Sequence, residues 1–170
     1  MRPTCVLSRL SSRIRRSTYR LKTHVGRTYT LRARALDKAG HVGPWDTERT
    51  MTPFDDGHRV GVRSAAGWTR TRSRKAYGRK LSRSSRRGVA FHFRFRGDRV
   101  YLVGRKSRFG GRALVNLNGR RRVISFFSRK TLNRRVVWKA RAKRRGVNRL
   151  RVLVLGTGRV EIDGLAFRRL

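Results

Sequence analysis

Residues 88–104, GVAFHFRFRGDRVYLVG, decide the fold of this chain. Large apolar side chains occupy every second position of the first half, at Val89, Phe91, Phe93 and Phe95. A period of two is typical of a strand that buries one face, and here the opposite face carries histidine and arginine. Gly97-Asp98 interrupts the run and Val100–Val103 resumes it. The stretch therefore predicts a β-hairpin with an aromatic face and a basic face.

The rest of the C-terminal region continues this pattern. No helical period follows Gly57, and Asn118-Gly119 is a strong signal for a two-residue hairpin turn. Residues 61–170 predict about eight strands with frequent turns, which is typical of an antiparallel β-sandwich. We expect the aromatic face of 88–104 to pack against a second sheet. Its predicted partners are Trp138, which shares a face with Val136, together with Val152 and Ile162.

The charge is extreme and uneven. The 170 residues include 47 Lys and Arg, 39 of them Arg, against 8 Asp and Glu, for a net charge of +39. Residues 1–56 contribute +7 and residues 57–170 contribute +32. A domain this basic attracts polyanions such as nucleic acid, anionic polysaccharide or other anionic surface polymers. The alternative is that arginine merely fills solvent positions in the product of a GC-rich gene.

The first 53 residues predict a separate unit, and residues 54–60 predict a linker. RTYTLRARAL at 27–36 alternates as a strand, a polar turn ending at Trp45 follows, and Thr47–Thr52 is a further short strand. The stretch resembles the last two strands of a fibronectin type III-like domain, joined by a D-x-A-G-N-x-S-x-W turn. The matching residues are Tyr29, Leu31, Ala33, Ala35, Asp37, Ala39, Gly40, Val42 and Trp45, whereas His41 replaces the usual Asn.

This resemblance implies a partial module of about four strands, because the family builds about seven over about 100 residues. We therefore expect either that the start codon is misplaced or that the chain is a fragment of a longer, secreted polypeptide. Residues 1–16 are rich in Arg and Ser and contain no apolar core of a secretory signal. The sequence also has no run of about 18 apolar residues that would predict a membrane-spanning helix.

Residues 65–170 contain a series of stretches in a fixed order, namely Trp68, VAFHFRF, YLVG, VNLNG, RVVWKA, LRVLVLGT and VEIDGLAF. With this series the region resembles galactose-binding-like jelly-roll domains of secreted bacterial proteins. The resemblance implies an all-β jelly roll and a non-catalytic role in carbohydrate binding or adhesion, outside the cell or at its surface. The basic surface departs from the usual Ser/Thr/Gly-rich one, which makes an anionic ligand a better expectation than a neutral sugar.

Groups for catalysis are scarce. The four His residues have no metal-ligand spacing, the single Cys5 allows no internal disulfide, and Asp55-Asp56 lies in the predicted linker. Glu161 and Asp163 share a strand face, and two carboxylates could act as in a glycosidase. Among so many cations we expect them to be ion-paired instead. We predict a protein that is not an enzyme and that needs no cofactor or metal.

Two basic loops contain aromatic residues with few apolar neighbours. Their predicted ligand-binding residues are Tyr77, Arg79, Arg105, Arg108, Phe109 and Arg112. Aromatic faces with planar guanidinium groups beside them suit acidic sugars, because arginine binds carboxylates through two hydrogen bonds. The alternative for each aromatic ring is that it packs beneath its own loop. Trp68 and Trp138 are predicted to belong to the core.

Nucleic-acid binding is the competing hypothesis. Arg94, Arg96, Arg99 and 120–122 could follow phosphates while loop aromatics stack on bases. No helix for a groove, zinc finger or RNA-binding motif accompanies them. Non-specific binding to DNA is expected for any protein with this charge.

Overall fold

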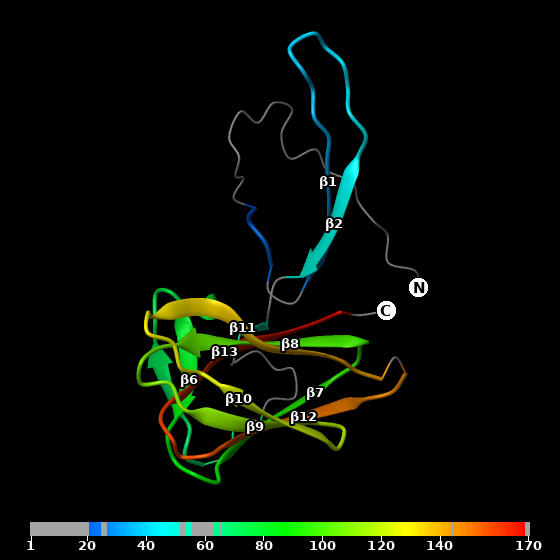
Figure 1. Cartoon of the computed structure of the whole chain (residues 1–170). Coiled ribbons are helices and arrows are strands. Elements are labelled where there is room, and N and C mark those ends of the chain that lie inside the picture. The colour runs from blue at the N-terminus through cyan, green and yellow to red at the C-terminus, as the bar shows by residue number, and fades with distance from the viewer. Residues whose placement is uncertain are drawn as a thin grey trace.

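Two antiparallel β-sheets stack face to face, and a third, two-stranded sheet precedes them (Figure 1). The computed structural model describes residues 21–24, 27–51, 54–55, 63–64, 66–143 and 145–168. These residues form strands and one 3-10 helix, η1 (Tyr77–Arg79). The predicted all-β jelly-roll sandwich is confirmed. No helix in the described part of the chain is long and apolar enough to cross a membrane.

The first layer is a five-stranded sheet in the order β10-β9-β12-β7-β4. Its strands are β4 (Arg63–Ser64), β7 (Ala90–Phe95), β9 (Arg112–Leu117), β10 (Arg120–Ser125) and β12 (Asn148–Val154). The predicted Asn118-Gly119 turn joins β9 to β10, with φ angles of 51° and 94° that this turn type requires.

The second layer is a six-stranded sheet in the order β11-β8-β13-β6-β5, with β3 also paired to β13. Its strands are β3 (Phe54–Asp55), β5 (Thr69–Arg72), β6 (Lys80–Ser84), β8 (Arg99–Lys106), β11 (Leu132–Arg141) and β13 (Val160–Arg168). Residues 54–60 were predicted to be a linker, but Phe54 and Asp55 pair with Leu165 and Gly164. The linker prediction is therefore wrong for these two residues.

The prediction of a hairpin over residues 88–104 is wrong. β7 pairs with β12 and β4, whereas β8 pairs with β11 and β13 in the opposite sheet. The chain crosses between the layers at residues 96–98. The buried Asn148 side chain donates hydrogen bonds to the carbonyl groups of Gly97 and Lys143, both at 3.0 Å. Because β7 and β8 both bury apolar side chains between the sheets, the alternation alone could not show that they belong to different layers.

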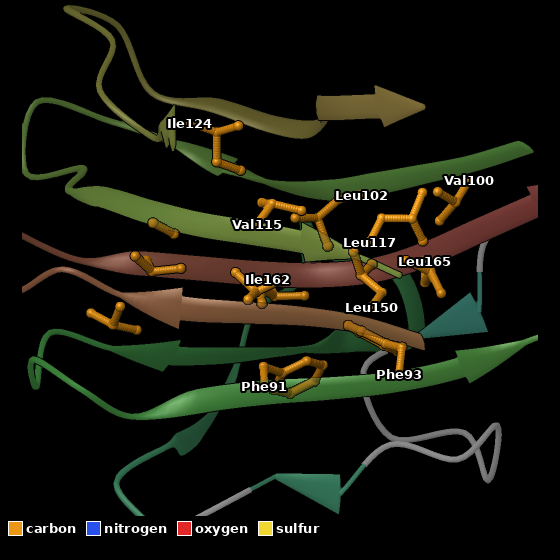
Figure 2. Close-up of a cluster of buried hydrophobic side chains, with 14 of the residues drawn as sticks. Phe91, Phe93, Val100, Leu102, Val115, Leu117, Ile124, Leu150, Ile162 and Leu165 are labelled. Carbon is orange, nitrogen blue, oxygen red and sulfur yellow. The ribbon is translucent and has the colours of Figure 1, made fainter. Parts of the chain in front are cut away.

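The core lies between the two sheets (Figure 2). Phe91, Phe93 and Phe95 project from β7 and are almost completely buried. The predicted partners Ile162 and Trp138 do lie in the facing sheet, whereas Val152 pairs with Phe91 as a neighbour in the same sheet. Trp68 contacts Phe91 edge-on with ring centroids 5.1 Å apart, so its predicted place in the core is confirmed.

Trp138 packs against the core from β11, but the prediction that it shares a face with Val136 is wrong. A register shift lies between these two residues, and the Val136 side chain is 53% exposed. The shift changes the side to which successive side chains point, and both Val137 and Trp138 pack against the core. A bulge of this kind has no sequence signal in a run of β-branched residues.

The N-terminal sheet consists of β1 (Thr28–Ala33) and β2 (Asp46–Met51), paired antiparallel. Trp45 ends the intervening turn, half exposed, with the guanidinium groups of Arg32 and Arg34 over its ring at 4.9 and 4.7 Å. His41 closes the turn by hydrogen bonding to Asp37, which lowers the pKa of that carboxyl. Most of the front half of the predicted four-strand module, and Cys5, lie outside the described residues.

Candidate binding surface at the loop end

Three loops meet at one end of the sandwich, namely those between β8 and β9, β10 and β11, and β12 and β13. Their backbones are joined by hydrogen bonds from the Gly111 N–H to the Arg159 carbonyl at 2.8 Å and from the Arg159 N–H to the Phe109 carbonyl at 2.8 Å. The Ser107 N–H donates to the Phe126 carbonyl at 3.1 Å. These backbone bonds hold the three loops as one unit.

Glycine is required where these loops touch. A Cβ atom at Gly110 would overlap the carbonyl group of Phe126, and one at Gly111 would overlap the backbone of Gly158. Gly158 itself has a φ of 138°, which side-chain-bearing residues rarely adopt. The glycines of this loop therefore serve close packing of backbones, which gives the loop end a fixed shape.

Phe109 stands at the tip of this unit and is 59% exposed. Two guanidinium groups flank its ring, that of Arg108 at 5.5 Å and that of Arg159 at 5.4 Å from the ring centroid. The alternative that Phe109 packs beneath its own loop is wrong. The exposed part of this ring can contact an apolar surface of a ligand while the two cations beside it bind acidic groups.

A hollow of about 460 Å³ is formed by the same three loops. It is open to solvent and is lined by Gly110, Arg112, Ser125, Phe127 and Thr157. Phe127 is 52% exposed, and the Arg112 backbone N–H donates to the Thr157 hydroxyl oxygen at 2.8 Å, which fixes one wall. The volume lies in the range of small-ligand pockets.

A second hollow of about 310 Å³ is lined in part by Thr69, Arg83, Ser84, Arg86 and Arg159. The Arg159 residue thus lines this hollow and also places its guanidinium over Phe109. We define the loop-end surface as Arg108, Phe109, Arg112, Phe127 and Arg159. It combines two exposed aromatic rings with three guanidinium groups, and it suits a planar or extended anionic ligand.

Three of the six predicted ligand-binding residues, Arg108, Phe109 and Arg112, meet at this surface. Arg105 lies instead on β8, where its Nε is 3.5 Å from a carboxylate oxygen of the buried Glu161. The expectation that Glu161 is ion-paired is confirmed. Arg105 therefore forms an ion pair with Glu161 and does not belong to the loop-end surface.

Tyr77 and Arg79 lie apart from Phe109, beside the outward side of β13. The Tyr77 backbone N–H donates to the buried Asp163 carboxylate at 2.7 Å. The Arg134 guanidinium lies 4.9 Å from the Tyr77 ring centroid and also donates to the carbonyl groups of Lys75 and Ala76. Burial raises the pKa of the half-buried Tyr77 hydroxyl. Tyr77 is thus held in the structure, while Arg79 is exposed beside it.

Sequence reasoning missed Phe127, Arg159 and Thr157. Phe126 and Phe127 are adjacent in sequence, and two consecutive residues of an extended chain point to opposite sides. Phe126 is fully buried and Phe127 is therefore turned outward. That signal was present in the sequence. No sequence signal indicated Arg159 and Thr157, because their role depends on which loops meet in the folded chain.

No three His, Cys, Asp or Glu side chains gather as metal ligands in the part of the chain that the structure describes. The buried acidic groups Glu161 and Asp163 contact Arg105 and the Tyr77 backbone. The loop-end surface offers aromatic rings and guanidinium groups, and the hollow of about 460 Å³ adds the hydroxyl groups of Ser125 and Thr157. Such a set can bind a ligand, but it contains no carboxylate, imidazole or thiol to exchange a proton with one near neutral pH.

Solved structures with a similar fold include carbohydrate-binding modules. A family 35 carbohydrate-binding module from Clostridium thermocellum matches 69% of this chain and 98% of its own, with a TM-score of 0.51 and 14% identity. One from Cellvibrio japonicus matches 66% of this chain and 90% of its own, with a TM-score of 0.51 and 15% identity.

A Paenibacillus xanthan lyase matches over 69% of this chain but only 13% of its own, with a TM-score of 0.51 and 12% identity. At these identities the likeness establishes the fold. No protein-family model and no curated protein sequence matches the chain.

Proposed function

We propose that this chain is a non-catalytic binding module whose loop-end surface binds an acidic carbohydrate or a similar anionic surface polymer. The observation that carries the proposal is the exposed Phe109 ring with the Arg108 and Arg159 guanidinium groups next to it, on loops fixed by backbone hydrogen bonds. The exposed part of the ring offers an apolar surface to a sugar, and the guanidinium groups pair with carboxylates. The fold supports the proposal, because solved structures of similar fold include carbohydrate-binding modules.

We further propose that residues 1–53 belong to a fibronectin type III-like unit and that the chain functions in a larger secreted bacterial protein. The support is the sequence resemblance that ends at Trp45, together with the paired strands β1 and β2 on either side of that turn. Leu36, Val42 and Trp45 are each at least half exposed, as expected for a hairpin that packs on further strands of its own module. The jelly-roll module then begins by Phe54, where β3 joins the sandwich.

The test is a titration with a polyuronate and with single-stranded DNA at about 0.3 M salt, where long-range attraction is largely screened. We expect the polyuronate to retain measurable affinity and Phe109→Ala to weaken it about tenfold, a loss of about 1.4 kcal/mol. Val147→Ala is the matched control, because Val147 is also half exposed but precedes β12 at the opposite end of that strand. Calorimetry gives both affinities.

Two results would contradict the proposal. If the affinity for every polyanion is lost equally at this salt concentration, the binding is only non-specific electrostatic attraction. A Phe109→Ala variant that binds DNA more weakly but polyuronate unchanged would instead favour nucleic-acid binding through base stacking.

A further inference from the structure

The outer face of the five-stranded sheet has a concentration of uncompensated positive charge. Outward positions on its strands alternate with the buried core residues, and the arginines and the histidine among them are exposed. We define the basic face as His92, Arg94, Arg121, Arg149 and Arg151. Strands β4, β7, β9, β10 and β12 contain no Asp or Glu, so no carboxylate within this sheet neutralises these groups.

The strand register sets like charges against each other. Arg94 lies directly opposite Arg149, and Arg151 lies opposite His92 on one side and Asn116 on the other. Arg121 lies opposite Asn116 from β10. Like charges at directly opposite positions destabilise a sheet, so this arrangement is costly to the free protein. An anion on the face would remove that cost.

The strand register connects the basic face to the loop-end surface across a short outward band of apolar residues, Leu114, Val123 and Leu153. Arg112, which lines the hollow beside Phe127, is the first residue of β9, and its carbonyl accepts the Leu155 N–H at 3.1 Å. From Leu155 the neighbouring strand β12 leads back through Arg151 to Arg149. Six residues at about 3.3 Å each make this path about 20 Å long, enough for several sugar units.

We propose that an acidic polysaccharide chain runs from the loop-end surface across the basic face, so that the protein binds a polymer rather than a single sugar or chain end. The ligand class rests on the proposed function, whereas the location rests on the register above. No Phe, Tyr or Trp side chain points outward from β7, β9, β10 or β12, since Phe91, Phe93 and Phe95 are buried. The face therefore lacks the stacking platform typical of single-stranded nucleic-acid sites, but it suits carboxylates.

The experiment compares a long polyuronate with a short oligouronide that fits the loop-end surface alone. In the double variant Arg94→Gln, Arg149→Gln we expect the polyuronate affinity to fall about tenfold, while the oligouronide affinity stays unchanged. The matched control is Arg135→Gln, Arg141→Gln, which removes the same charge from exposed positions on β11 of the other sheet. A thermal melt of each variant shows that the fold is retained.

Three outcomes would overturn the inference: an unchanged polyuronate affinity, an equal loss in the control variant, or a larger loss for single-stranded DNA than for polyuronate. A loss of polyuronate binding in the double variant, with Phe109→Ala affecting neither ligand, would support the basic face and refute the loop-end proposal. If the double variant keeps its polyuronate affinity while Phe109→Ala lowers the affinity for both ligands, only the basic-face inference would be refuted.

Discussion

The outer faces of the two sheets differ in the partners of their charged side chains. On the six-stranded sheet, Glu161 and Asp163 are buried, and they contact Arg105 and the Tyr77 backbone. On the five-stranded sheet, Arg94 faces Arg149 and no strand supplies a carboxylate. One chain thus contains arginine that stabilises the fold and arginine that does not.

This difference bears on the alternative that arginine merely fills solvent positions. If arginine merely filled solvent positions, opposite cations would cost stability with no return. The few acidic residues of the C-terminal region are instead concentrated near β8 and β13, and the basic face is left open. We infer that this face is kept cationic for an anionic partner.

The largest effect is expected on the six-stranded side. Arg105→Ala leaves the buried Glu161 without its nearest cation, and breaking such a pair costs about 3 kcal/mol of unfolding free energy. Urea denaturation measures the loss, with Arg135→Ala as the control at an exposed position. Polyuronate affinity should not change, because Arg105 lies outside the loop-end surface. An unchanged unfolding midpoint would show that this pair does not stabilise the sheet.

A smaller effect of opposite sign is expected on the basic face. Arg149→Gln removes one of two directly opposed cations and should raise the unfolding free energy by about 0.5 kcal/mol. The same denaturation experiment detects this gain. The gain should shrink in high salt, which screens the repulsion. A loss of stability would mean that the Arg94–Arg149 pair is not repulsive, and the contrast between the faces would fail.

The smallest effect concerns pH. Burial and the nearby charge of Arg151 lower the pKa of His92 from its usual value near 6.5. Arg94 lies on the same face of β7 as His92, and Arg63 of β4 lies opposite His92 in the register. The unfolded chain therefore binds the proton first, so stability contributed by neutral His92 is complete above about pH 6.5 and is lost as the pH falls towards the lower, folded value.

We expect wild type to lose slightly more stability than His92→Gln between about pH 7.5 and pH 5. Other groups titrate equally in both proteins, so the difference isolates His92. Bound polyuronate should cancel it, because a carboxylate beside the imidazole favours the protonated form. Identical pH profiles for the two proteins would contradict the account of the basic face.

The sequence predicted the strands well and their partners poorly. Local alternation located the strand of Phe91 and the Asn118-Gly119 turn, because period and turn chemistry are local properties. The layer that each strand joins depends on contacts between distant residues. The crossover near Gly97 depends on Asn148, about fifty positions later, which no local pattern could indicate.

The candidate surface was predicted in part for the same reason. Phe109 and Arg108 are neighbours in sequence, so their shared loop was visible. Arg159 reaches Phe109 only because the loop after β12 meets the loop after β8. Arg105 was misplaced because its partner Glu161 is distant in sequence.

The most direct test of the central claim is an amide and arginine side-chain NMR titration of the isotope-labelled chain with polyuronate at about 0.15 M salt. We predict shifts concentrated at Phe109, Arg159, Arg149 and Arg151, with Arg105 unaffected. Shifts spread equally over the arginines of both sheets would contradict the claim, because they would show attraction to net charge without a defined surface.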